Sequence, residues 1–259
     1  MYSKTFKLSL LIFFFACNNH ASSQQEHTMA TNSTSKENPY SRISKIPAPE
    51  GFRRIAVAEN SFAGWLRNVH LKTDITVYKY DGTKKENQEA QFAVLDIPVG
   101  TKDLQQCADA VMRLRAEYLF AQKKYSEIIF TDNEGKKYTF DEPYNRAHFE
   151  VYLERVFGMC GTASLSKQLH EVNDIKQIMA GDVLIRGGFP GHAVIVMDVA
   201  VDSSGRKAYV LSQSYMPAQD IHVLKNPSNE SASPWYFVND DPVIHTPEYT
   251  FRSNELKRW

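Results

Sequence analysis

The sequence has little of several features that would each point to one class of protein. Only three of its 259 residues are cysteines, which excludes a disulfide-rich scaffold. Neither sign of charge is in excess, with 30 basic and 30 acidic residues, and this argues against a nucleic-acid partner because binding phosphates needs clustered Lys and Arg. No internal repeat is visible. Aromatic residues make up 12% of the chain, enough for the core of one sizeable domain or two small ones.

The N-terminus has the pattern of an export signal. Two lysines precede an apolar run over residues 8–15 that is too short to span a bilayer, and Ala16-Cys17 follow. A small residue directly before a cysteine resembles the lipobox of bacterial lipoproteins, which implies a signal peptide over residues 1–16 and lipidation of Cys17. Ordinary cleavage near Ala21 is the alternative. We therefore expect an exported, membrane-anchored lipoprotein of the bacterial cell envelope, facing the periplasm or the cell surface.

Composition divides the rest of the chain into a tether and one domain. Residues 17–50 are rich in Ser, Asn, Thr and Gln, which predicts a flexible tether, and residues 51–259 are predicted to form a single domain. The strongest predicted helix begins at a cap on Thr101 or Asp103 and ends near residue 123. Its apolar stripe includes Cys107, which this prediction places about one turn inside the helix.

A Gly- and Pro-rich turn separates two β-branched runs, residues 183–185 and 193–196. Runs of this kind predict two strands joined by a tight turn, with His192 opening the second strand. Residues 207–214 and 221–224 have the pattern of two further strands. Together with the predicted helices, they indicate an α+β fold in which helices pack on a mainly antiparallel sheet.

Three residues in these elements suit thiol chemistry. A thiol hydrolase needs a thiolate, a base within reach and a third group that holds the base. Cys107 would supply the thiol and His192 the base. Gln213 on the next strand would supply the third group, although strand alternation does not decide whether it or one of its neighbours, Ser212 and Ser214, faces His192. We expect the Cys107 sulfur to lie within about 4 Å of a His192 ring nitrogen. A lone histidine in a turn more often only satisfies backbone groups.

Other roles for these residues stay open. Cys107 could be an inert core thiol or form a disulfide with Cys160, and Cys160 is itself a second candidate nucleophile because it precedes a capped helix. Asp109, Arg113 and Glu117 are most simply ion pairs along a helix face, although they could line a cleft and bind the charged ends of a peptide. The remaining histidines lack metal-ligand spacing, so no metal or other cofactor is expected.

Two family resemblances bear on this site. The order of helix cysteine, Gly-Asp-Val-Leu-Ile at 181–185, glycine-rich turn and His-Ala-Val-Ile-Val at 192–196 resembles the NlpC-type branch of papain-like cysteine peptidases, over about residues 101–224. This resemblance implies a papain-like fold, Cys107 as nucleophile, His192 as base and cleavage of amide bonds in peptidoglycan stem peptides. That family usually has its cysteine at the helix start. A cysteine one turn inside would be activated less by the helix N-terminus.

The second resemblance covers nearly the whole mature chain. Motifs beginning at Cys107 (C-A-D-A), Pro190 (P-G-H-A-V) and Gln213 (Q-S-Y-M-P-A-Q) are similar to those of a bacterial family, the domain of unknown function numbered 4846. This family brings no established activity.

These features favour a cell-envelope cysteine peptidase or amidase that acts on peptide or amide bonds. The candidate substrate-binding residues are Asp109, Arg113, Glu117, Ser214 and Tyr215. The alternative is a non-catalytic envelope lipoprotein that binds a glycan or peptide in the same cleft. A lowered pKa of the Cys107 thiol would favour the enzyme. The expected partners are a peptide or peptidoglycan-like substrate and the membrane, and no sequence feature fixes an oligomeric state.

Overall fold

The structure, a computed structural model, describes Met1 and residues 37–259. The expected signal peptide, Cys17 and the first part of the expected tether lie outside the described residues. Within residues 37–259, every helix is too short or too polar to cross a membrane.

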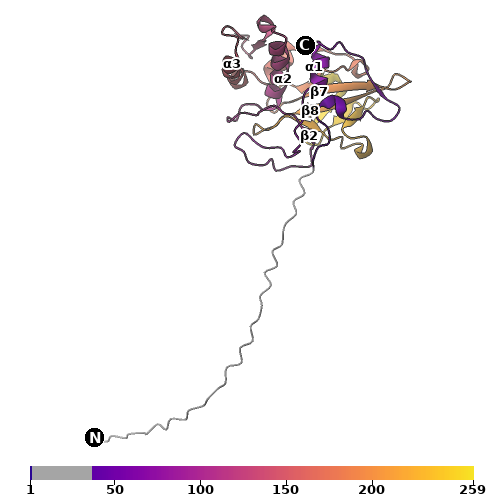
Figure 1. The fold of residues 1–259 in the computed structure, drawn as a ribbon, viewed down its shortest axis with the longest axis horizontal. Helices are drawn as coiled ribbons and strands as arrows, with labels where there is room; N and C mark the ends of the chain where they lie inside the picture. The colour runs from indigo at the N-terminus through magenta and orange to yellow at the C-terminus, as the bar shows by residue number, and fades with distance from the viewer. Residues whose placement is uncertain (2–36) are drawn as a thin grey trace. The chain divides into compact units, whose positions relative to one another are not determined.

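A nine-stranded antiparallel sheet organises the domain (Figure 1). Its main path runs β2-β9-β8-β7-β6-β13-β5, with β1 beside β7 and β10 beside β8. The strands that build the site are β6 (Val183–Arg186), β7 (His192–Val201), β8 (Lys207–Gln213) and β9 (His222–Leu224). The others are β1 (Arg53–Arg54), β2 (Gln91–Val94), β5 (His170–Glu171), β10 (Trp235–Phe237) and β13 (Leu256–Arg258).

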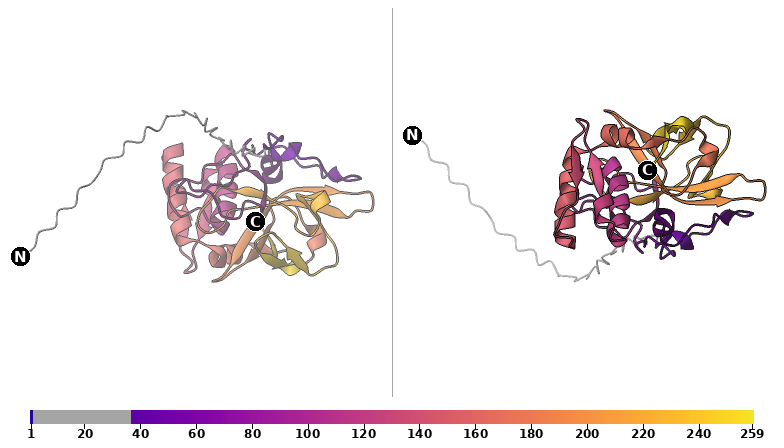
Figure 2. Two further views of the ribbon diagram at one scale, coloured as in Figure 1. Left: turned by 90° about the horizontal axis from the view of Figure 1, so that it is seen from below. Right: turned by 90° about the horizontal axis from the view of Figure 1, so that it is seen from above.

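Among residues 37–259, four α-helices and two small hairpins complete the fold. The helices are α1 (Phe62–Arg67), α2 (Cys107–Ala121), α3 (Arg146–Met159) and α4 (Thr162–Gln168). The hairpins are β3 (Ile129–Thr131) with β4 (Lys137–Thr139), and β11 (Val243–His245) with β12 (Thr250–Arg252). Figure 2 shows α2 and α3 side by side at one end of the domain, from which the long central strands extend. The predicted α+β arrangement, with helices packed on a mainly antiparallel sheet, is confirmed.

Side chains alternate along β7 between two apolar cores. Ala193 and Ile195 face the larger core, which they share with α2, while Val194 and Val196 face a smaller core that includes Phe251 of β12. All five side chains are buried. Because β7 is covered on both faces, its sequence is a continuous apolar run instead of an alternating one.

Polar side chains cap the starts of two of the helices. The Ser61 side chain accepts a hydrogen bond from the Gly64 N–H at the start of α1, and the Asn145 side chain accepts one from His148 at the start of α3. At its other end, α3 continues past Gly158 to Met159. A glycine weakens a helix without ending it unless the backbone turns left-handed there.

The folded domain begins earlier than the predicted boundary at residue 51. Ile43 and Ile46 have exposed fractions of 0% and 1% and belong to the larger core. The Arg54 guanidinium donates hydrogen bonds to the carbonyl oxygens of both residues. Residues 43–46 are therefore part of the domain and not of a flexible tether. Composition alone did not indicate this, because the residues around the two isoleucines are mostly polar. Burial of the two isoleucine side chains is enough to hold the segment on the domain.

Candidate functional site

Cys107 is the first residue of α2, and the prediction that it lies one turn inside the helix is wrong. Asp109 sets the helix start because its Oδ2 accepts a hydrogen bond from the Gln106 N–H at 3.0 Å. Asp103, the predicted cap, instead accepts a hydrogen bond from the Ala218 N–H at 2.7 Å. The Cys107 N–H is therefore one of the first N–H groups of a helix, which have no acceptor within the helix.

The Cys107 thiol is buried among backbone N–H groups. Burial, followed by the charge of Asp109, raises the pKa of the thiol to about 11, while the N–H groups of Ala108, Ala193 and Cys107 itself act to lower it. The resting group is therefore a neutral thiol. The three N–H groups are nonetheless placed to stabilise negative charge on the sulfur or on an atom bonded to it.

His192 is buried and held by a hydrogen bond from its ring to Gln213. The distance from His192 Nε2 to Gln213 Oε1 is 2.8 Å, so the predicted contact between these residues is confirmed. The imidazole also packs against the rings of Tyr215, Tyr249 and Phe251, at centroid distances of 4.9, 4.8 and 5.8 Å. Burial lowers the pKa of His192 to about 4, so the imidazole is neutral at physiological pH.

The positions of Ala193 and Tyr215 relate the Cys107 thiol to the His192 imidazole. The Cys107 thiol lies against the N–H of Ala193, the residue after His192. Tyr215 packs beside the His192 ring, and burial raises the pKa of Tyr215, with the charges of Glu248 and Cys107 adding to the rise. Within residues 37–259, no hydrogen bond joins the side chains of Cys107 and His192. Their direct contact stays a prediction.

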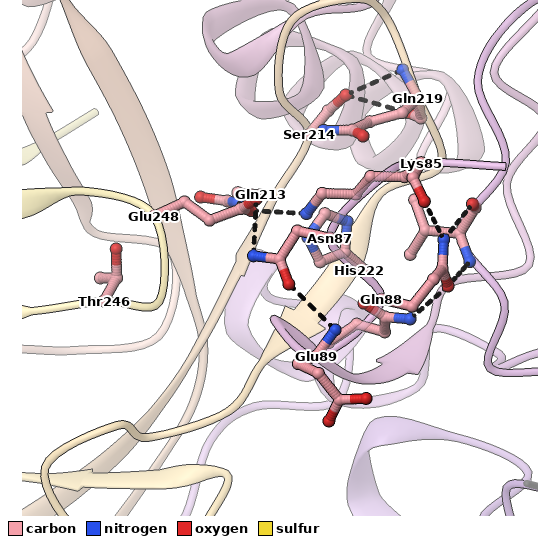
Figure 3. A network of polar contacts seen from close by, with 12 residues as sticks. Lys85, Asn87, Gln88, Glu89, Gln213, Ser214, Gln219, His222, Thr246 and Glu248 are labelled. Carbon is pink, nitrogen blue, oxygen red and sulfur yellow. Dashed lines mark hydrogen bonds and ion pairs between the residues drawn. The ribbon is translucent and has the colours of Figure 1, made fainter.

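Behind Gln213 the polar chain continues through three residues to which no local sequence pattern points (Figure 3). Gln213 Nε2 donates to Glu248 Oε2 at 2.8 Å. The same Oε2 accepts from Lys85 Nζ at 2.5 Å, and Asn87 Nδ2 donates to Glu248 Oε1 at 3.2 Å. Burial lowers the pKa of Lys85, and its hydrogen bond to Glu248 opposes this. Lys85 and Asn87 lie in a charged stretch that looks solvated in the sequence, and 163 residues separate Lys85 from Glu248.

A cleft of about 480 Å³ opens beside the Cys107 sulfur. It lies between the starts of α2 and α4, the end of α3 and the turn between β6 and β7. Three large apolar side chains that line it are exposed, Met159 by 53%, Phe189 by 91% and Met216 by 55%. Asp109 also lines this cleft, whereas His192 lies buried next to the lining. The cleft therefore offers an apolar surface to a ligand close to the thiol.

Arg113 and Glu117 form ion pairs between α2 and α3. Arg113 Nε lies 2.7 Å from Glu117 Oε1, and Arg113 Nη2 lies 3.1 Å from Glu150 Oε1. Arg146 Nη1 lies 2.6 Å from Glu117 Oε2. The simpler interpretation of this ladder, ion pairs along a helix face, is confirmed for Arg113 and Glu117 but not for Asp109, which accepts a hydrogen bond from the Gln106 N–H and forms no ion pair within the described residues. Of the predicted ladder, only Asp109 is among the residues that line the described cleft.

Ser214 is buried and joins the end of β8 to the turn before α2. Its hydroxyl oxygen lies 2.9 Å from Gln105 O and 2.8 Å from Gln219 O. Cys160, the alternative nucleophile, ends α3 and lines the same cleft as Cys107. Both cysteines are free thiols, and burial raises the pKa of Cys160 to about 11 as well. Cys107 differs from Cys160 in its position at a helix start.

Acid is expected to destabilise the domain through two buried histidines. Burial lowers the pKa of His192 from 6.5 to about 4 and that of His222 to about 3. Because both folded-state values lie below the unfolded value, each neutral histidine stabilises the folded state above pH 6.5. That contribution is lost progressively as the pH falls from 6.5 toward the folded values, by roughly 3 kcal/mol for each histidine at pH 4.

Urea unfolding between pH 7 and pH 4 measures this loss. His222→Gln is expected to flatten the fall in unfolding free energy, whereas the same change at the exposed His170 is expected to leave the slope as it is. Equal slopes for the three proteins would contradict the assignment.

Within the described residues, no group of three or more His, Cys, Asp or Glu side chains is placed to hold a metal ion.

Comparison with known proteins identifies the family of this chain. One family model, described as a domain of unknown function (4846), matches in two segments, residues 43–145 and 138–258. The two segments together span most of the chain. A comparison with curated proteins gave no match, and neither did a comparison with solved structures. The first segment contains Cys107, and the second contains His192, Gln213 and Glu248. Because the matched segments cover most of its length, this chain belongs to the family of the domain of unknown function numbered 4846.

Proposed function

We propose that the protein is a thiol hydrolase that cleaves peptide or amide bonds, with Cys107 as nucleophile and His192 as base. The observation that carries this proposal is the 2.8 Å hydrogen bond between His192 Nε2 and Gln213 Oε1. It orients the imidazole of His192, and the N–H of the next residue, Ala193, lies against the Cys107 thiol. A nucleophile, a base and a group that orients the base are the elements that thiol catalysis needs.

The first chemical step follows from the protonation states. Because Nε2 is engaged by Gln213, Nδ1 is the ring nitrogen left to take the thiol proton. With a thiol pKa of about 11 and an imidazole pKa of about 4, the resting pair is neutral. Proton transfer to His192 Nδ1 therefore accompanies the attack of the sulfur on the carbonyl carbon. The Cys107 N–H, which has no acceptor within the helix, stabilises the charge on the carbonyl oxygen.

The remaining steps return the site to its starting state. The imidazolium gives its proton to the leaving nitrogen, the C–N bond breaks, and a thioester remains on Cys107. His192 then takes a proton from water as that water attacks the thioester, which releases the acid and restores the thiol. Hydrogen bonds at a catalytic site often tighten only when substrate binds, so the sulfur and Nδ1 are expected to approach in the complex.

A papain-like arrangement of the NlpC type is part of this proposal. It is supported by a helix that starts at the cysteine and packs on the antiparallel sheet whose strand β7 carries the histidine. The NlpC-type family has its cysteine at the helix start, and Cys107 occupies this position instead of lying one turn inside the helix as the sequence predicted. The likeness favours amide bonds of peptidoglycan stem peptides as the substrate, and the exposed apolar lining of the cleft suits aliphatic side chains.

The test is hydrolysis of short peptidoglycan stem peptides by the purified protein under reducing conditions, followed by amine release. We expect release from at least one stem peptide. The alternative function, binding of a glycan or peptide without cleavage, is favoured by one observation, the raised pKa of the Cys107 thiol. Saturable binding of the same peptides with no amine released would support binding and contradict the hydrolase.

We also propose that the protein is an exported lipoprotein held in the membrane through Cys17. The support is the sequence pattern of residues 1–17. Replacing Cys17 with Ser is expected to move the protein from the membrane fraction to the soluble fraction of cells that express it, because a single lipid-bearing residue carries the anchor. Membrane association unchanged by this substitution would contradict the anchor.

A further inference from the structure

The side-chain amide of Gln213 has two ends that differ in hydrogen-bonding chemistry. Its oxygen only accepts hydrogen bonds, and its nitrogen only donates them, so the partners decide which end faces which neighbour. One neighbour is His192, whose neutral ring could present either a donor or an acceptor at Nε2. The other neighbour is Glu248, a carboxylate that only accepts. Glu248 therefore decides that the Gln213 nitrogen faces away from His192.

The protonation of the imidazole follows from this orientation. With Gln213 Oε1 facing His192 at 2.8 Å, the ring must present an N–H at Nε2. A neutral imidazole carries one proton, so Nδ1 is left bare and able to accept. Glu248 thus sets the orientation of the Gln213 amide, and this orientation sets which nitrogen of His192 carries the proton.

Glu248 is itself held in place from several sides. Lys85 and Asn87 occupy its two oxygens, and the Lys85 and Glu248 side chains are only 5% and 13% exposed. Glu248 also lies in a tight turn, where the Thr246 N–H donates to Tyr249 O at 2.9 Å. Figure 3 shows Glu248 reaching from this turn toward Lys85 and Asn87, which come from a distant part of the chain. An ion pair this buried holds the Glu248 side chain in one position.

We propose that Glu248, held by Lys85 and Asn87, is a positioning residue that fixes the tautomer of His192 through Gln213. For catalysis this inference rests on the proposed function, because a bare Nδ1 matters only if His192 takes the thiol proton. The tautomer itself is a property of the folded protein and can be measured without any substrate.

Exchanging the two charges gives a direct test. The double substitution Lys85→Glu with Glu248→Lys keeps an ion pair but presents a donor to Gln213. The amide must then turn over, its nitrogen faces His192, and the ring proton must move to Nδ1. Nitrogen NMR of the full-length protein labelled at histidine reports both ring nitrogens. We expect a bare Nδ1 in the wild type, a protonated Nδ1 after the exchange, and loss of amide hydrolysis.

A matched control is the same exchange in the exposed pair Glu89 and Lys225, which is expected to change neither the spectrum nor the hydrolysis. If the charge exchange prevents folding, Lys85→Met with Glu248→Leu removes both charges and is expected to shift the Nδ1 signal of His192 toward the protonated position. A folded variant of either kind with an unchanged His192 spectrum would overturn the inference. The expected change of tautomer, together with no amide hydrolysis by the wild-type protein, would instead refute only the proposed function.

Discussion

Replacing Cys107 with Ala is expected to abolish amide hydrolysis, with a fall in kcat of about 10³-fold or more. His192→Ala is expected to cost nearly as much, and the double variant no more than either single one, because nucleophile and base act as a unit. Gln213→Leu is expected to cost less, since it removes only the orientation of the imidazole. The measurement is the rate of amine release from stem peptides under reducing conditions.

Cys160→Ala is the matched control for this experiment. Cys160 is also a buried free thiol that lines the same cleft, but it ends a helix instead of starting one. Its replacement is expected to leave hydrolysis intact. Loss of activity in Cys160→Ala with activity retained in Cys107→Ala would move the nucleophile to Cys160.

Asp198→Ala is expected to be the most destabilising single substitution away from the site, at roughly 3–5 kcal/mol of unfolding free energy. The Asp198 side chain is completely buried, and it lies 2.6 Å from Arg54 Nε and 2.6 Å from Arg67 Nη2. The same two guanidinium groups donate to carbonyl oxygens of Ile43 and Ile55, so the carboxylate fastens the N-terminal segment to β7. Without it, two largely buried arginines lose their counter-charge.

Chemical denaturation of Asp198→Ala and of Glu89→Ala measures this difference. Glu89 belongs to an ion pair in which its own side chain is 82% exposed. Its replacement is expected to cost less than about 1 kcal/mol, because exposed pairs are weakened by solvent and salt. A loss from Asp198→Ala as small as that from Glu89→Ala would contradict the role of this ion pair in joining the segment to the sheet.

Elements with strong local signals could be predicted from the sequence. The β-branched runs beside the turn at residues 187–191 are β6 and β7, and His192 and Gln213 lie on neighbouring antiparallel strands as predicted. The pattern did not decide between Gln213 and its neighbours, and the structure shows that Gln213 contacts the imidazole. Caps at Ser61 and Asn145 also act where a short polar side chain precedes an apolar helical stripe. In each case the deciding interactions lie within a few residues or between adjacent strands.

Features decided by distant contacts could not be predicted in the same way. Either Asp103 or Asp109 could cap the start of α2. Asp109 does so because Asp103 accepts a hydrogen bond from the N–H of Ala218, more than a hundred residues away in the sequence. Likewise, nothing local shows that Lys85 is buried, because only folding brings Glu248 beside it. A charged stretch is most often a solvated surface, so the sequence gives no reason to place Lys85 and Asn87 behind Gln213.

The most direct measurement for the central claim is mass spectrometry of the protein after rapid acid quenching during hydrolysis of a stem peptide. Thiol catalysis predicts an acyl group joined as a thioester to the proteolytic fragment that contains Cys107, and no such adduct in the His192→Ala variant. An acyl group on Cys160, or amine release with both cysteines unmodified throughout the reaction, would contradict the assignment of Cys107 as the nucleophile.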